Sequence, residues 1–337
     1  MDRIRVFVGL DYHQLSVQVC VLDASGRVLH NRRCSNDWRA VVKRVEAFGL
    51  VVRVAIESCA GAADLAEELV HRAGWSVDLA HPGFVSRMKQ NPDKTDFSDA
   101  RMLADLTRVG YLPRVWLAPA EVRELRRLVR YRQQLVDERR NIKLRISALL
   151  RDQRIMNAPA RRWTLAWVHW LRETDDFGEH SRWIVDRHLA RFGSLVEDIR
   201  QVESRLEQTT RDDLVVSRLM SYKGIGAVTA WVLRAEIGRF DRFHNGKQLA
   251  RFCGLSPRNA SSGERQADAG LIKAGNRQLR ATLIEAAHRL IRFDPRWMMF
   301  ADRLIRKGKP KCVVVAAAGN RWVRWLFHQM QPEMLAA

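Results

Sequence analysis

The chain has 337 residues, with 58 Lys and Arg against 38 Asp and Glu, so its formal net charge is +20. This excess suits a polyphosphate partner such as DNA or RNA, and the hydrophobic fraction of 47% excludes a basic disordered tail. The five scattered cysteines form no Cys-x-x-Cys pair, which argues against a zinc site and a disulfide framework. No signal peptide or long apolar stretch is evident, so we expect a cytoplasmic protein that makes no contact with a membrane.

The first block of the chain, residues 1–113, predicts a mixed α/β sheet. Three strands are expected at residues 5–10, 15–22 and 27–34, followed by a helix at 37–48. A strand at 51–57, a helix at 62–73 and a short strand at 76–80 come next. A strand meander followed by alternating strands and helices is the element order of the ribonuclease H-like, or RuvC-like, architecture.

Four acidic residues stand at the ends of these elements. Asp11 ends the apolar run that starts at Val6, and Glu57 ends the run that starts at Val51. Asp96 and Asp99 lie three residues apart at an expected helix start, on one helix face. Clustered carboxylates repel one another and are normally neutralised by a hard divalent cation, so we predict a Mg²⁺ (or Mn²⁺) site. Taken singly, Asp96 and Asp99 would instead cap a helix and support its dipole.

The second block, residues 119–214, predicts two long helices. Leu128, Leu135, Ile142 and Leu149 recur every seven residues, and a second segment repeats the pattern with Val185, Phe192, Ile199 and Leu206, with Leu189 and Val196 beside it. This spacing indicates an antiparallel coiled-coil hairpin or dimerisation arm. An ordinary helical domain with a solvated basic face is the open alternative.

Three tryptophans between the two helical segments, Trp163, Trp167 and Trp170, fall at helical spacing. They predict either a buried aromatic stripe, which we favour, or a surface on which nucleotides stack.

The third block, residues 215–330, is expected to be mainly helical. It opens with Lys223-Gly224-Ile-Gly226 before a helix, which resembles a helix-hairpin-helix element. In such an element, glycines allow backbone N–H groups to approach a phosphate. The same residues would also form a simple tight turn.

Short motifs that follow one another along nearly the whole chain carry a family resemblance. The N-terminal motifs are Gly9-Leu-Asp11, Glu57-Ser-Cys-Ala-Gly61 and Lys94-Thr-Asp96-Phe-Ser-Asp99. The C-terminal motifs are Gly224-Ile-Gly226, Gly254-Leu-Ser-Pro257, Ser261-Ser262-Gly263 and Lys273-Ala-Gly275-Asn276-Arg277-Gln-Leu-Arg280. Together and in this order, they resemble the DEDD transposases of insertion sequences, the group described as bridge-RNA-guided recombinases.

The resemblance implies a RuvC-like domain, a coiled-coil arm and a C-terminal transposase domain. It implies a metal-bound catalytic centre formed by Asp11, Glu57, Asp96 and Asp99, and a catalytic serine that attacks DNA and forms a covalent phosphoserine link. We assign that serine to Ser262, with Ser261 in reserve. The residues expected to bind nucleic acid are Lys94, Lys223, Gly224, Gly226, Arg258, Lys273, Asn276, Arg277 and Arg280. Alternatively, the basic residues among them form a solvated helix face without binding nucleic acid.

The partners expected from this resemblance are DNA, namely the element ends and the target, and a noncoding guide RNA. We also expect a homo-oligomer, a dimer or tetramer, in a prokaryotic cytoplasm, associated with the nucleoid when acting. Two other functions stay open. The first is a metal-dependent nuclease or Holliday-junction resolvase in which water replaces the serine. The second is a non-catalytic nucleic-acid-binding protein with structural carboxylates.

Overall fold

The computed structural model describes residues 3–88, 95–259, 268–272 and 275–332. The chain divides into two compact units, Met1–Pro119 and Ala120–Ala337, and each unit contains hydrophobic core of its own. Within the described part of the chain, no helix combines the length and the apolar character needed to cross a bilayer.

The first unit is built on a six-stranded sheet in the order β3-β2-β1-β4-β5-β6. The meander β1–β2–β3 is antiparallel. Next to it, β4 pairs in parallel with β1, β5 pairs in parallel with β4, and β6 pairs in antiparallel fashion with β5 at the edge of the sheet. The strands are β1 (Arg5–Tyr12), β2 (Ser16–Asp23), β3 (Val28–Ser35), β4 (Leu50–Glu57), β5 (Val77–Ala80) and β6 (Arg114–Val115).

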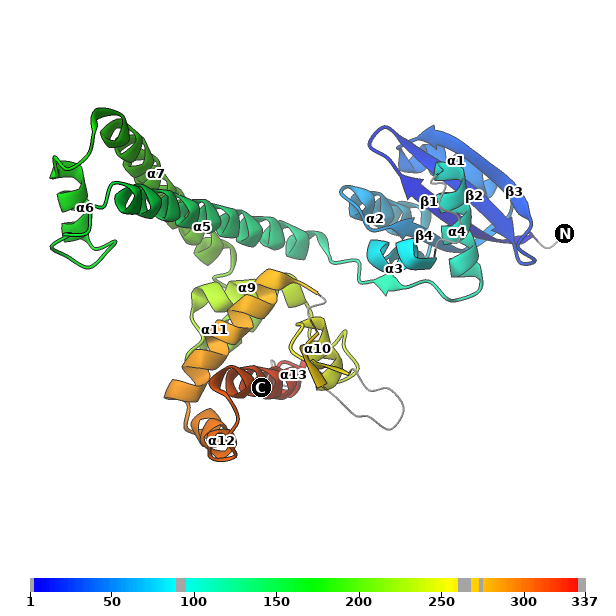
Figure 1. Ribbon diagram of the computed structural model, residues 1–337. Coiled ribbons are helices and arrows are strands. Elements are labelled where there is room, and N and C mark those ends of the chain that lie inside the picture. Colours follow the sequence, from blue (N-terminus) through cyan, green and yellow to red (C-terminus); the bar gives the residue numbers. More distant parts are fainter. Residues whose placement is uncertain (1–2, 89–94, 260–267, 273–274, 333–337) are drawn as a thin grey trace. The chain divides into compact units, whose positions relative to one another are not determined.

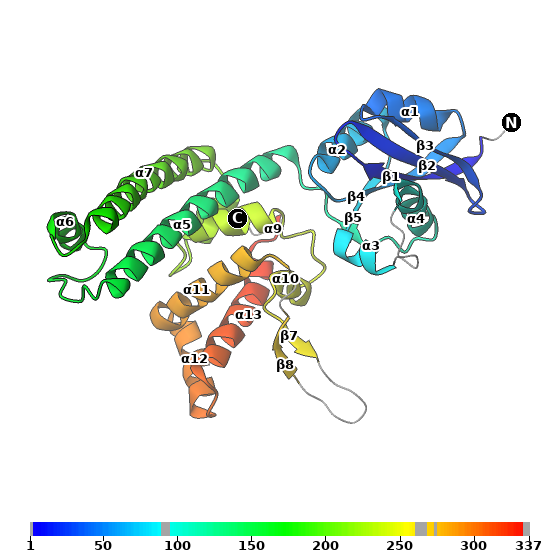
Figure 2. The ribbon, with the colours of Figure 1, turned by 45° about the horizontal axis from the view of Figure 1, so that its top comes forward.

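Helices cover both faces of this sheet (Figures 1 and 2). The alternating residues Val6, Val8 and Leu10 of β1 point into the core shared with α1 (Trp38–Glu46) and α2 (Ala62–Ala73). The opposite face carries α4 (Asp96–Arg108) and α3 (Pro82–Met88). This strict alternation of side chains along a strand decides which residues face α4.

The second unit begins with two long helices, α5 (Ala120–Asp152) and α7 (Glu179–Thr209), which pack along each other, with α6 (Leu165–Glu173) at one end (Figures 1 and 2). The expected apolar rows lie largely between them, but Val196 is 42% exposed and Leu195 is buried in its place. A seven-residue repeat drifts against the 3.6-residue turn of a straight helix, which explains the shift. Arg132, which interrupts one row, pairs with Glu203 of α7 across the helix pair.

The tryptophans near α6 belong to the core of this unit. Trp167 is fully buried, and its ring centroid lies 4.6 Å from that of Trp163. Trp163 also packs near Phe192 of α7, and the Lys143 ammonium lies 4.9 Å from the Trp163 ring centroid. The packing matches the buried stripe that we favoured.

The remaining described residues of the second unit form helices and one two-stranded ribbon. An ion pair joins α9 to α5: the exposed guanidinium of Arg130 donates to both carboxylate oxygens of the buried Glu236, at 2.8 and 3.0 Å. The helices are α8 (Leu214–Met220), α9 (Ala227–Ile237), α10 (Gly246–Phe252), α11 (Arg277–Phe293), α12 (Pro295–Arg306) and α13 (Lys311–Gln329), and the ribbon is β7 (Pro257–Asn259) with β8 (Asp268–Leu271).

The element order expected for the first block is present, and α3 and β6 are additions that the sequence did not predict. The mixed sheet is compatible with a ribonuclease H-like domain. The coiled coil, the helix-hairpin-helix element and the three-part domain division stay predictions.

Candidate metal centre

Two neighbouring parallel strands end in carboxylates on the same face of the sheet. Gly9 of β1 lies opposite Ala55 of β4, and Leu10 lies opposite Ile56. Asp11 and Glu57 are the next residues along, and by alternation they share the α4 face with Gly9 and Ala55. Desolvation of its thiol, and then the negative charges of Glu57 and Asp11, raise the pKa of Cys59, so both carboxylates lie near that sulfur.

The first turn of α4 supplies the other two carboxylates. Thr95 caps the helix, and its side-chain oxygen accepts the Ser98 backbone N–H at 3.2 Å, in a capping box with Ser98. Asp96 is therefore the first helical residue. Asp99 follows one turn later and is buried, with 4% exposure. The side chains of Thr95 and Ser98 accept each other's backbone N–H groups at the start of α4, so capping this helix does not need the Asp96 carboxylate.

Close packing at Gly9 brings the two elements together. A Cβ atom on Gly9 would lie 2.0 Å from the Ala100 carbonyl oxygen and 2.4 Å from the Ala104 nitrogen, both backbone atoms of α4. Only a glycine allows such an approach of helix to strand. Because Gly9 is two residues before Asp11, and Ala100 directly follows Asp99, this contact places the first turn of α4 beside the end of β1.

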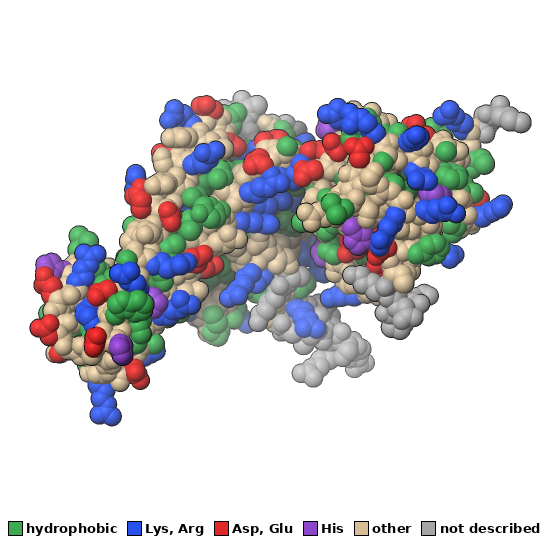
Figure 3. Space-filling model, turned by 90° about the horizontal axis from the view of Figure 1, so that it is seen from above, with side chains coloured by type: hydrophobic (Ala, Val, Ile, Leu, Met, Phe, Trp, Pro, Cys, Tyr) green, Lys and Arg blue, Asp and Glu red, His purple; other side chains and the backbone are tan. Residues whose placement is uncertain are grey.

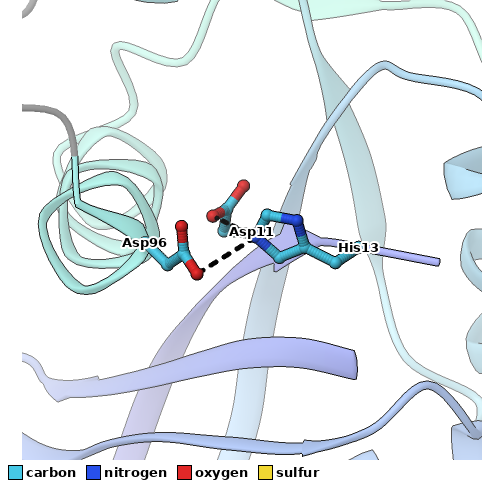
Figure 4. A group of neighbouring side chains, drawn as sticks. All are labelled: Asp11, His13 and Asp96. Atoms are coloured by element: carbon cyan, nitrogen blue, oxygen red, sulfur yellow. Dashed lines mark ion pairs between the residues drawn. The ribbon is translucent and has the colours of Figure 1, made fainter. Parts of the chain in front are cut away.

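Asp11, His13 and Asp96 meet at this point (Figure 4). His13 Nε2 lies 3.2 Å from an oxygen of Asp11 and 3.2 Å from an oxygen of Asp96. Arg33 of β3 donates to that same oxygen of Asp96. One ligand atom from each of Asp11, His13 and Asp96 falls within 4.8 Å of the others, a spacing compatible with one metal ion.

The two aspartates have opposite electrostatic character. Burial raises the pKa of Asp11 from its ordinary value; His13 opposes this, and the charges of Asp96 and Asp99 add to it. The hydrogen bond from Arg33 lowers the pKa of Asp96, with His13 contributing, against a small effect of burial. A crowded carboxylate beside others is a site at which a divalent cation relieves repulsion.

All four predicted carboxylates thus belong to neighbouring elements on one face of the sheet. The tight cluster within the described residues consists of Asp11 and Asp96 with His13, and it does not include Glu57 or Asp99. The negative charge of Asp99 raises the pKa of Asp11. The pairing register of β1 and β4 places Glu57 on the strand next to Asp11. His13 and Arg33 are residues that the sequence analysis missed.

Comparison with known proteins places this site in a family. A family model for DEDD transposases of the IS110 type, described as "Transposase", matches residues 8–154, and a second model, "Transposase IS116/IS110/IS902 family", matches residues 216–302. The chain belongs to the IS110 family of DEDD transposases. It is accordingly an enzyme that acts on DNA.

Several individual relatives match as well. The transposase for the insertion sequence element IS1328 of Yersinia enterocolitica is 26% identical over 268 residues, 80% of this chain and 78% of that protein. The transposase for IS1111A of Coxiella burnetii is 25% identical over 330 residues, 94% and 88% of the two chains. A protein of Sinorhizobium fredii named as a transposase is 28% identical over 207 residues, 61% of this chain, and the match spans only 50% of its own length.

The predicted C-terminal residues of this transposase fall into three groups. Ser261, Ser262, Lys273 and also Lys94 lie outside the described residues. Lys223, Arg258 and Arg277 are exposed, and Gly226 is the N-cap of α9 with open space around it. Gly224 has φ +82° and packs near the Arg289 side chain, and Arg280 is half-buried. Asn276 caps α11, because its side-chain oxygen accepts the N–H groups of Gln278 and Leu279.

The segment that holds the two serines joins β7 to β8, and its base is well defined. The Ile272 N–H donates to the Ser256 carbonyl at 2.8 Å, and Pro257 lies opposite Leu271. A Cβ on Gly275 would lie 2.7 Å from the Phe252 carbonyl oxygen, so the end of α10 and the start of α11 are in direct contact. The Asn320 side chain donates to the Leu255 carbonyl and ties α13 to the same place.

Proposed function

We propose that this chain is the transposase of an insertion sequence, and that it cuts and exchanges DNA strands with the carboxylates of its first unit. The observation that carries the proposal is the meeting of Asp11 and Asp96, from a strand end and a helix start, in a protein with a net charge of +20. Burial and the charges of Asp96 and Asp99 raise the pKa of Asp11, so an ionised Asp11 opposes folding unless a cation offsets its charge. The cluster is compatible with a site that binds a cation.

Asp11, Glu57, Asp96 and Asp99 would hold Mg²⁺ or Mn²⁺, since carboxylate oxygens are the ligands that both ions prefer. The bound ion would polarise the scissile phosphoryl group and stabilise the charge that develops on it. Arg33 and His13 would serve a second purpose here. When no cation is bound, Arg33 would neutralise Asp96 and His13 would lie within hydrogen-bond distance of it. When a cation binds Asp96, both side chains would have to move away from the carboxylate oxygen that they contact.

Ser262 would supply the nucleophile, with Ser261 as the reserve. Its hydroxyl oxygen would form a bond to phosphorus as one P–O bond to deoxyribose breaks, and the released sugar oxygen would take up the serine proton. The phosphoserine link would conserve the bond energy for religation to a new strand. The support for this proposal is the family motif, and the fact that the strands before and after the serines in the sequence, β7 and β8, pair with each other.

The remaining assignments are also proposals. Lys94, Lys223, Arg258, Lys273, Arg277 and Arg280 would contact phosphates, and the N–H groups beside Gly224 and Gly226 would approach one at the start of α9. Asn276 would act mainly by holding α11 in place. A noncoding RNA would guide the protein to its target, and the chain would act as a dimer or tetramer.

A metal-dependent nuclease or Holliday-junction resolvase is the second candidate. It is favoured by the fact that Asp11, His13 and Asp96, the described cluster that could hold a metal ion, all belong to the first unit. In that reaction water would replace Ser262, and no covalent adduct would form. A non-catalytic DNA-binding protein is the third candidate, and it predicts that the carboxylates can be exchanged without effect.

A strand-cleavage assay tests the metal centre. Purified protein would be incubated with labelled DNA carrying the element's junction and the flanking noncoding RNA, with Mg²⁺, Mn²⁺ or EDTA. We expect cleavage that needs a divalent cation and falls at least a hundredfold in Asp11→Asn. Glu46→Gln is the matched control, because Glu46 is an exposed acid in the same unit. Equal cleavage by Asp11→Asn and wild type would contradict the proposal.

A further inference from the structure

A cavity of about 860 Å³ lies in the second unit, among α10, α12 and α13. This volume is within the range of roughly 300–1,000 Å³ that is typical of small-ligand pockets. Among the expected catalytic and nucleic-acid-binding residues that the structure describes, none lines the cavity.

The lining of the cavity is strongly basic. Its cations come from α10, α12 and α13, and they are Lys247, Arg296, Arg303, Arg321 and Arg324. Among the described residues that line the cavity none is acidic, and none of these five cations forms an ion pair within the described ranges. Several arginines gathered without carboxylates repel one another, so the cavity is suited to an anion.

Aromatic rings, and not carboxylates, lie beside three of the arginines. The Arg296 guanidinium lies 5.2 Å from the ring centroids of both Trp297 and Trp325. The guanidiniums of Arg303 and Arg321 each lie 5.5 Å from the Phe300 centroid. Stacking on a ring orients a guanidinium and leaves its N–H groups free for a phosphate.

The walls of the cavity are fixed before any ligand binds. A Cβ on Gly246 would lie 2.7 Å from the Arg324 carbonyl oxygen, so α10 packs directly on the backbone of α13. Asn245 caps α10 by accepting the Gln248 N–H at 2.9 Å. Trp297 is buried and meets Trp325 edge to face, with centroids 6.3 Å apart. A site built in this way binds without a large ordering cost.

We propose that this cavity binds an unpaired nucleotide of a nucleic-acid strand. The arginines would hold the phosphate, and the base would stack against the guanidinium and ring planes of Arg303, Arg321 and Phe300. A base that enters the cavity must first leave a duplex, so the site would select single strands over double strands. RNA and DNA share this chemistry. The lining residues of the cavity are not members of the carboxylate cluster or of the serine motif, and binding there would need neither metal nor cleavage.

The test measures binding, by fluorescence anisotropy in EDTA, of single-stranded DNA, of single-stranded RNA of the same sequence, and of the DNA duplex. Phe300→Leu keeps an apolar side chain and removes the ring without changing charge. We expect it to weaken binding of both single strands about tenfold, with little change in duplex binding and in the salt dependence.

A double variant, Arg303→Ala with Arg321→Ala, tests the phosphate contacts. We expect single-strand binding to fall about tenfold or more, and the slope of log affinity against log salt to decrease by about 1.4, the value for two lost phosphate contacts on a single strand. Arg292→Ala is the matched control, since Arg292 stacks on Phe293 in the same manner but does not line the cavity. Circular dichroism would confirm that each variant is folded.

The outcomes separate the proposal from its rivals. A tenfold loss for both single strands in Phe300→Leu supports the site, and a larger loss for RNA or for DNA identifies the strand that it prefers. Equal losses in Phe300→Leu and Arg292→Ala, an unchanged affinity in Phe300→Leu, or an acidic peptide that binds as tightly as the single strand would each overturn it. Asp11→Asn should bind as wild type does, so failure of the cleavage proposal would leave this result intact.

Discussion

Gly9 and Ala100 are in direct backbone contact, and this contact sets the geometry of the carboxylate cluster. The Gly9 Cα faces the Ala100 carbonyl so closely that a Cβ would come within 2.0 Å of it. Asp11 lies two residues beyond Gly9 on the same strand face, and Asp99 directly precedes Ala100. The site therefore depends on a residue that contributes no functional group.

Gly9→Ala should separate α4 from the sheet. The added methyl group would meet backbone atoms that cannot move without shifting the helix, so we expect a loss of about 3 kcal/mol in the free energy of unfolding and loss of cleavage. Urea titration and the cleavage assay measure the two effects. Gly193→Ala is the control, because Gly193 lies within α7 with open space around it, and this change should stabilise the protein by up to about 1 kcal/mol. A Gly9→Ala protein of wild-type stability would contradict the packing argument.

Asp11→Asn should abolish cleavage and yet stabilise the metal-free protein. The pKa of Asp11 is raised in the fold, so its ionised form opposes folding at neutral pH, and this cost disappears as the pH falls below the unfolded value. The variant should melt at a higher temperature than wild type in EDTA at pH 7, and the gap should close in acid. Mg²⁺ or Mn²⁺ should raise the melting temperature of wild type only. A variant that melts lower at pH 7 would show that Asp11 is a structural carboxylate.

Arg33→Ala should affect the protein through Asp96. The hydrogen bond from Arg33 lowers the pKa of Asp96, so its contribution to stability is present above the unfolded pKa of about 3.9 and is lost as the pH falls through the folded value. Arg33 is 62% exposed, so we expect a cost of less than about 1 kcal/mol at pH 7 and none in strong acid. NMR titration should show a higher Asp96 pKa in the variant. Because Arg33 and a cation would compete for the Asp96 carboxylate, Arg33→Ala should bind Mn²⁺ more tightly than wild type does. Weaker binding by the variant would contradict that role.

Glu236→Gln should loosen the junction between α5 and α9. Glu236 is 5% exposed and accepts from Arg130 through both oxygens, and Arg126 Nε lies 3.6 Å from one of them. Glu236→Gln leaves two arginines without their anion, but the Arg130 side chain is 53% exposed and water screens part of the loss, so we expect a cost of about 1–2 kcal/mol. Chemical denaturation measures it. Glu121→Gln, at the exposed start of α5, should change stability by less than about 0.5 kcal/mol.

Sequence patterns predicted the sheet because its strands are apolar runs that end at turns and carboxylates. The position of Asp11 and Glu57 at the ends of paired strands followed from the rule that neighbouring parallel strands end at one edge. The contacts of His13 and Arg33 did not follow, because β3 is an edge strand whose side chains meet α4 only in the folded unit. His13 continues the alternation from Asp11, and that spacing was the one available signal. The basic cavity was also hidden, since its residues come from three helices spread over residues 245–328.

A covalent-trapping experiment tests the central claim most directly. Wild type, Ser262→Ala, Ser261→Ala and Asp11→Asn would each be incubated with a divalent cation, the flanking noncoding RNA and labelled junction DNA, and then separated on a denaturing gel. The account predicts a protein–DNA adduct that is lost in Ser262→Ala and in Asp11→Asn but kept in Ser261→Ala. Loss in Ser261→Ala alone would move the nucleophile by one residue. Cleaved DNA without any adduct, unchanged by either serine substitution, would contradict the recombinase chemistry and indicate a nuclease.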